Sequence, residues 1–210
     1  MNFSFRRAKE LPNARLVLDL CRELGGTMGV SSGQLSHFDD VPSNWRCPCC
    51  TRTKRGIARL NVRGELYCPI HKHHDHVVDD LGILIQFGAL SLQEDYAKEL
   101  PQAFDVNIAT CERFVALYIC GDCNRAEKEA KGAVPDVPSY FTFAPFEISQ
   151  FIGVYPNAGH GIVEETVHRA YAEALPQVNV LRARARDMAS RLPGQLRAAY
   201  LATPRFTMPE

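Results

Sequence analysis

The sequence predicts a protein of the α+β class, in which a small metal-stabilised core lies between helical segments at both ends. Three observations favour this class. Two CxxC pairs stand far apart in the chain, and they are Cys47/Cys50 and Cys120/Cys123. Short apolar runs of strand type lie beside both pairs, with a histidine-rich stretch at 66–80 between them. The segments before residue 44 and after residue 133 instead carry apolar residues at helical spacing.

Composition is that of an ordinary globular protein, since 46% of the 210 residues are hydrophobic and 23% are charged. The formal net charge is zero, so the overall charge does not indicate a nucleic-acid partner. A local basic cleft is still compatible with such a partner. We find no apolar run of membrane-spanning length and no signal-peptide segment, and therefore expect a cytoplasmic protein without a membrane partner. Thiols stay reduced there, so eight cysteines favour metal binding over disulfides.

The N-terminal extension, residues 1–44, is expected to contain one helix. Asn13 can cap it, and apolar residues then recur at helical spacing as far as Leu24. Gly25 and Gly26 follow directly and predict its end. Residues 27–44 are rich in Gly, Ser, Asp and Pro, which indicates a loop.

A core region, residues 45–132, begins at Trp45. It is expected to hold strands at 57–62 and 65–70 around a turn at Arg63-Gly64, then a strand at 114–119 and a helix at 124–131 that Gly132 ends. A short helix is expected at 91–100, where Ser91 and Glu94 have the spacing of a capping box. The helical C-terminal region, 133–210, is expected to hold helices at 145–154, 162–175, 177–192 and 195–201.

Basic side chains crowd the start of the core, because no acidic residue occurs between Arg46 and Arg63. A run of arginines is commonly a solvated face, but beside a metal site it also suits phosphate binding. The expected nucleic-acid-binding set is Arg52, Lys54, Arg55, Arg59 and Arg63.

The two CxxC pairs predict a structural zinc site. Zinc prefers four tetrahedral ligands, and each CxxC supplies two thiolates from one turn. The expected ligands are Cys47, Cys50, Cys120 and Cys123. An alternative stays open, in which Cys68 and His71 complete a zinc-ribbon site with the first pair.

Four histidines fall within six residues, namely His71, His73, His74 and His76, and Asp75 lies among them. Imidazole and carboxylate groups at this density suit a divalent cation that activates a water molecule. Side chains alternate along a strand, so His74 and His76 share one face and Asp75 points to the other. If the strand does not bend at its end, His74 and not Asp75 is the expected ligand of the metal ion.

With these motifs, residues 45–132 resemble the HNH endonucleases, the ββα-metal family, in their zinc-binding CxxC form. The resemblance rests on Asp75-His76 after a strand and on CxxC-Asn at Cys120–Asn124. It implies DNA cleavage in which His76 deprotonates water, while Asp75 and Asn124 hold Mg²⁺ or another divalent ion. The chain departs from the family at Val115, where an Asn that orients the base is expected, and at Glu127 in place of a Lys. The gap of 44 residues from His76 to Cys120 is also longer than the compact motif, so residues 81–110 resemble an insertion.

Two other functions remain compatible with the residues. One is a non-catalytic zinc module that binds nucleic acid or protein, and the other is a hydrolase that uses the histidines on a different substrate. A module needs the cysteines but not His76, whereas the nuclease needs both.

Overall fold

The structure is a computed structural model, and it describes residues 13–26, 35–77, 79 and 111–191. Within these residues the fold combines helices with three short antiparallel strand pairs, which agrees with the α+β class. The insertion expected at 81–110 and the helices expected at 91–100 and 195–201 lie outside the described residues. No helix in the described part of the chain combines the length and apolar character needed to cross a membrane.

The chain divides into two compact units, and each unit is made of three segments that are separated in the sequence. One unit comprises residues 1–73, 116–137 and 143–171, and the other comprises 74–115, 138–142 and 172–210. The N-terminal helix therefore belongs to the same unit as most of the core, because its apolar face packs there.

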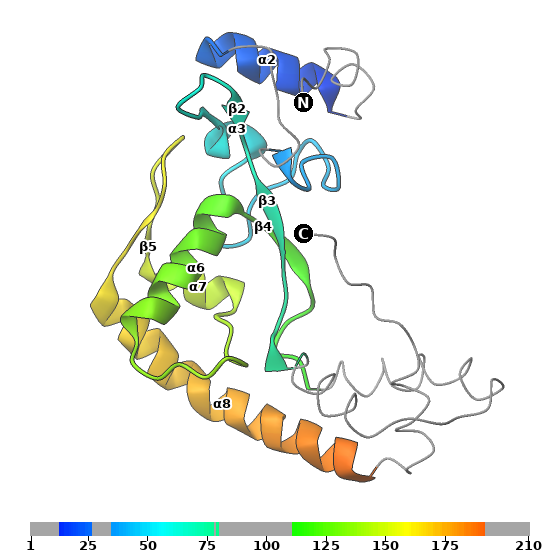
Figure 1. Cartoon of the computed structure of the whole chain (residues 1–210), viewed down its shortest axis with the longest axis vertical. Helices are drawn as coiled ribbons and strands as arrows, with labels where there is room; N and C mark the ends of the chain where they lie inside the picture. The colour runs from blue at the N-terminus through cyan, green and yellow to red at the C-terminus, as the bar shows by residue number, and fades with distance from the viewer. Residues whose placement is uncertain (1–12, 27–34, 78, 80–110, 192–210) are drawn as a thin grey trace, which may run out of the picture. The chain divides into compact units, whose positions relative to one another are not determined.

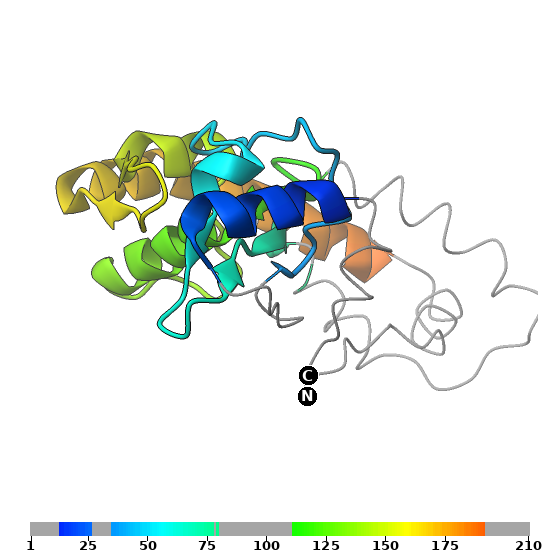
Figure 2. The same cartoon turned by 90° about the horizontal axis from the view of Figure 1, so that it is seen from above.

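That helix, α2 (Ala14–Leu24), has the expected bounds and buries Val17, Leu20 and Cys21. Gly25 ends it in the left-handed conformation, with φ of 67°, as the Gly-Gly pair predicted. Asn13 stands at the N-cap, but its side chain makes no cap hydrogen bond. Its Nδ2 instead donates to Asp39. The helix lies beside α3 and β2 (Figures 1 and 2).

Residues 54–67 differ from the expected strands. A short helix, α3 (Lys54–Ile57), replaces the start of the first strand because the Thr53 side chain caps it by accepting from the Gly56 N–H. What remains is β1 (Arg59–Leu60), which pairs antiparallel with β2 (Leu66–Tyr67). Gly64 has φ of 73° in the turn between them, where the sequence predicted one.

A second strand pair and a helix form the centre of the first unit. β3 (Ile70–His73) is separated from β2 by Pro69, which has no N–H to continue a ladder. It pairs antiparallel with β4 (Leu117–Cys120), in the register Ile70↔Cys120 to His73↔Leu117. Helix α6 (Gly121–Ala133) follows β4 without a loop and contacts both strands (Figure 1). It is longer than expected, and Gly132 lies inside it.

The C-terminal region is less helical at its start than expected. α7 (Pro145–Phe151) ends early, and β5 (Ile152–Gly153) pairs with β6 (Gly161–Ile162). α8 (Glu164–Arg191) replaces the two helices expected at 162–175 and 177–192. Pro176 lies inside α8. A proline there removes one backbone hydrogen bond and can kink the helix, but it does not end α8.

Candidate metal centres

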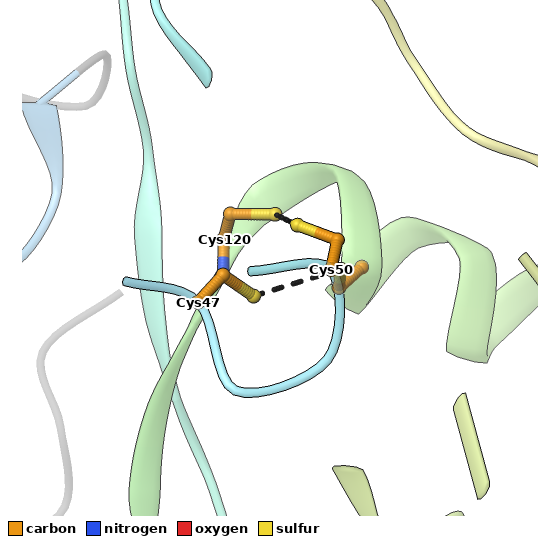
Figure 3. Close-up of side chains that lie close together, drawn as sticks. Cys47, Cys50 and Cys120 are labelled. Carbon is orange, nitrogen blue, oxygen red and sulfur yellow. Dashed lines mark hydrogen bonds between the residues drawn. The ribbon is translucent and has the colours of Figure 1, made fainter. Parts of the chain in front are cut away.

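Four buried cysteine sulfurs gather in the first unit. Cys47 and Cys50 come from the loop before α3, Cys120 ends β4, and Cys123 lies in the first turn of α6. The Sγ atoms of Cys47 and Cys123 are 3.7 Å apart, and those of Cys50 and Cys120 are also 3.7 Å apart. Figure 3 shows the sulfurs of Cys47, Cys50 and Cys120 turned toward one another. We call these four residues the tetracysteine site.

This donor set fits a zinc ion. With zinc–sulfur bonds of about 2.3 Å, the corners of a tetrahedron lie about 3.8 Å apart, which is close to both sulfur–sulfur distances. Hydrogen bonds with Cys120 and Cys123 lower the pKa of Cys50, which favours the thiolate form that a metal ion needs. The site can therefore hold a metal ion such as zinc.

The zinc-ribbon alternative does not match the arrangement. Cys68 is fully buried, and its Sγ donates to the Lys54 carbonyl at 3.5 Å instead of joining the other sulfurs. Burial also raises the pKa of Cys68 to about 12, which keeps it a neutral thiol. His71 lies on β3 outside the tetracysteine site.

Local backbone geometry forms the first half of the tetracysteine site. The Cys47 N–H donates to the Arg52 carbonyl at 2.9 Å, and the Thr51 N–H donates to the Cys47 carbonyl at 2.8 Å. Thr51 adopts φ of 61°, which closes this tight turn. The Cys120 N–H also points at the Cys47 sulfur, 3.3 Å away, so the turn is joined to the end of β4.

Two of the five basic side chains expected to bind nucleic acid are buried inside the first unit. Arg52 is 8% exposed and its guanidinium contacts the tetracysteine site, whereas Lys54 is 1% exposed. These two side chains do not reach a phosphate, since their N–H groups already serve acceptors within the protein. Arg59 is partly buried and pairs with Asp122 at 2.8 Å. Arg55, which pairs with Glu23, and Arg63 are exposed and remain in the expected set.

Lys54 is predicted to matter for stability and not for DNA. Its Nζ donates to the carbonyls of Phe38 and Val41, at 2.6 and 2.8 Å, and lies over the Phe38 ring. Lys54→Met should lower the free energy of unfolding by about 1–3 kcal/mol, because two buried carbonyls lose their donor. Urea denaturation measures this. Arg63→Met, on an exposed turn, is the control and should change stability by less than about 0.5 kcal/mol. A fully stable Lys54→Met protein with weaker DNA binding would contradict the assignment.

A second group of potential metal ligands lies in the other unit, and it comprises His74, His76 and Asp79. His74 Nε2 and His76 Nδ1 approach the same Asp79 oxygen, Oδ2, at 3.0 and 2.7 Å. The two rings are 4.7 Å apart, and all three side chains are at least one-third exposed. Burial acts to raise the pKa of Asp79, but hydrogen bonds with both histidines outweigh it and hold that pKa well below its usual range.

Asp75, the expected metal ligand, is not part of this group. Its side chain is fully buried, and its oxygens accept from the Arg113 and Val77 backbone N–H groups at 2.9 and 3.3 Å. The Arg113 guanidinium lies 3.6 Å from the same carboxylate. Asp75 thus anchors the segment that carries the histidines. Strand alternation predicted that Asp75 would face away from His74 and His76, and the structure agrees.

His73 of the histidine-rich stretch and Asn124, the second expected metal ligand, lie in the first unit, apart from the group of His74, His76 and Asp79. His73 is buried at the end of β3, with Nε2 2.8 Å from the Phe143 carbonyl, so it is engaged inside the first unit. Asn124 lies half-buried in the first turn of α6, also in the first unit. Asp79 is a partner of the histidines that was not expected from the sequence. Its position three residues after His76, one helical turn along, is the signal that favours it.

The chain has no match among protein-family models, curated proteins or solved structures.

Proposed function

We propose that this protein is a metal-dependent endonuclease of the HNH type that hydrolyses phosphodiester bonds in DNA. One observation carries the proposal. β3, β4 and α6 form a strand–strand–helix arrangement that the tetracysteine site joins to the loop before α3. His74 and His76 follow directly in the chain after β3.

His76 is the proposed general base. Its Nδ1 lies 2.7 Å from Asp79, so the carboxylate accepts the Nδ1–H in the neutral tautomer. The other ring nitrogen, Nε2, then keeps a lone pair that can take a proton from water. Asp79 thereby supplies the orienting group that the sequence lacks at Val115.

The reaction also needs a divalent ion, which would neutralise charge on the phosphate as the bond breaks. His74 and Asp79 have the donor types and the exposure to hold it, whereas the Asp75 carboxylate is occupied by Arg113 and Val77. A role for Asn124 as a ligand rests on the family resemblance alone. Because His74 offers an imidazole nitrogen, Mn²⁺ should support cleavage at least as well as Mg²⁺.

Nicking of supercoiled plasmid DNA tests the proposal. Zinc-loaded protein should convert supercoiled plasmid to the open circle when Mn²⁺ or Mg²⁺ is added. A brief excess of a chelator that leaves the structural zinc in place should stop the reaction. Folded, zinc-loaded protein that cleaves no DNA with any divalent ion would contradict the proposal. DNA or protein binding by such a protein would favour the non-catalytic zinc module instead.

Asp79→Asn is predicted to lower the cleavage rate by about 10²-fold or more while DNA affinity stays unchanged, because the amide does not hold the His76 tautomer as a carboxylate does. Initial nicking rates and a filter-binding titration measure the two quantities. Asp40→Asn is a matched control, since Asp40 pairs with His37 at the same three-residue spacing. Equal losses in both variants would show that Asp79 has no particular role.

A further inference from the structure

We infer that Arg52 sets the zinc affinity of the tetracysteine site by hydrogen-bonding to its sulfurs, and that it attaches the segment 155–160 to this site. The Arg52 guanidinium contacts two of the four sulfurs. Nε donates to Cys50 Sγ and Nη2 donates to Cys120 Sγ, each at 3.5 Å. The side chain is almost fully buried, so these contacts are made away from solvent.

Charge balance makes this contact important. A zinc ion with four thiolates carries a net charge of −2, and burying such a charge is costly unless a cation or hydrogen-bond donors compensate it. Arg52 brings both. Its guanidinium is oriented by Asp122, whose Oδ2 accepts from Nη2 at 2.8 Å. Hydrogen bonds from the surrounding protein to metal ligands commonly change metal affinity by about 10–100-fold.

The same guanidinium fixes the connection between β5 and β6. Its Nη1 donates to the carbonyls of Tyr155 and Ala158, at 2.8 and 2.9 Å. Nη2 lies 3.0 Å from Nε2 of His160, which is also buried. This segment has no regular structure of its own. Arg52 holds its two ends, whereas Asn157 in its middle bonds to the backbone of residues 55, 56 and 58. A loss of zinc or of Arg52 should therefore loosen it.

An arginine serves these partners better than a lysine does. Its five N–H groups face seven acceptors, so each Nη group shares its two hydrogens among three acceptors. Its planar group presents five N–H donors in a fixed fork, whereas a lysine ammonium is a single point charge with three. The acceptors around Arg52 comprise two sulfurs, one carboxylate oxygen, one imidazole nitrogen and the carbonyls of Gly56, Tyr155 and Ala158. This set explains the position of Arg52 without a nucleic acid.

Arg59 provides a matched control. It pairs with the same carboxylate, at 2.8 Å to both Asp122 oxygens, but no sulfur contact is recorded for it among the described residues. Replacing it removes a neighbouring positive charge and an Asp122 partner while leaving the guanidinium–sulfur contacts of Arg52 in place.

The experiment compares full-length wild type, Arg52→Met, Arg52→Lys and Arg59→Met by zinc competition against a chromophoric chelator. Arg52→Met should bind zinc about 10–100-fold more weakly, Arg52→Lys should fall between it and wild type, and Arg59→Met should stay close to wild type. Hydrogen exchange at saturating zinc should be faster at 155–160 in both Arg52 variants.

Wild-type zinc affinity in Arg52→Met would overturn the inference, and so would equal losses in Arg52→Met and Arg59→Met. If Arg52→Met does not fold, Arg52→Lys decides, because wild-type affinity and unchanged exchange at 155–160 in that variant would overturn it as well. Neither readout involves DNA cleavage, so the result is independent of the proposed nuclease activity.

Discussion

Replacing Cys120 or Cys123 by Ser is expected to leave the chain unfolded and without zinc. Both sulfurs belong to the tetracysteine site, which joins the loop before α3 to the junction of β4 and α6. A structural zinc contributes on the order of 10 kcal/mol to folding, which equals the whole stability of a typical domain. Soluble yield, circular dichroism and zinc content by mass spectrometry measure the outcome. Removing zinc from wild type with a strong chelator should have the same effect.

Cys68→Ser is the control for this prediction. Cys68 is as deeply buried as the cysteines of the tetracysteine site, but it lies outside that site and its Sγ donates to the Lys54 carbonyl. We expect a folded, zinc-loaded protein that has lost about 1–2 kcal/mol, the usual range for a modest change in a core. Soluble, zinc-loaded Cys120→Ser together with collapse of Cys68→Ser would contradict the tetracysteine site and favour the ribbon alternative.

His76→Ala is expected to abolish DNA cleavage while zinc content, folding and DNA affinity remain at the wild-type level. The proposed role of His76 is to take a proton from the attacking water, and a positioned base of this kind contributes about 10²–10⁴ in rate. The imidazole is partly exposed, and its recorded polar side-chain contact is with Asp79, so its loss should disturb packing little. Plasmid nicking over a titration of Mn²⁺ measures the rate.

A histidine outside the proposed site provides the comparison. His168 is exposed on α8, and His168→Ala should cleave DNA at the wild-type rate. Additional Mn²⁺ should not restore His76→Ala, since a metal ion does not replace a missing base. A His76→Ala protein that nicks as fast as wild type would end the nuclease assignment of this residue.

Several features could be predicted from local sequence because they depend on neighbouring residues only. The CxxC spacing places two thiolates on one turn, which is why the four cysteines were predicted correctly as potential zinc donors. Helix α2 ends at Gly25 because a glycine adopts positive φ at little cost. Alternation along an extended chain placed His74 and His76 together and turned Asp75 away.

Other features required the tertiary structure, because they depend on partners distant in the chain. Arg113 lies 38 residues from Asp75 and occupies its carboxylate, which leaves Asp79 as the acidic partner of the histidines. The density of basic residues in the sequence predicted that Arg52 and Lys54 belong to a basic surface, whereas both side chains are buried. Asp122 is 70 residues from Arg52, and His160 is 108 residues away. A buried charge needs such partners, and local pattern does not reveal them.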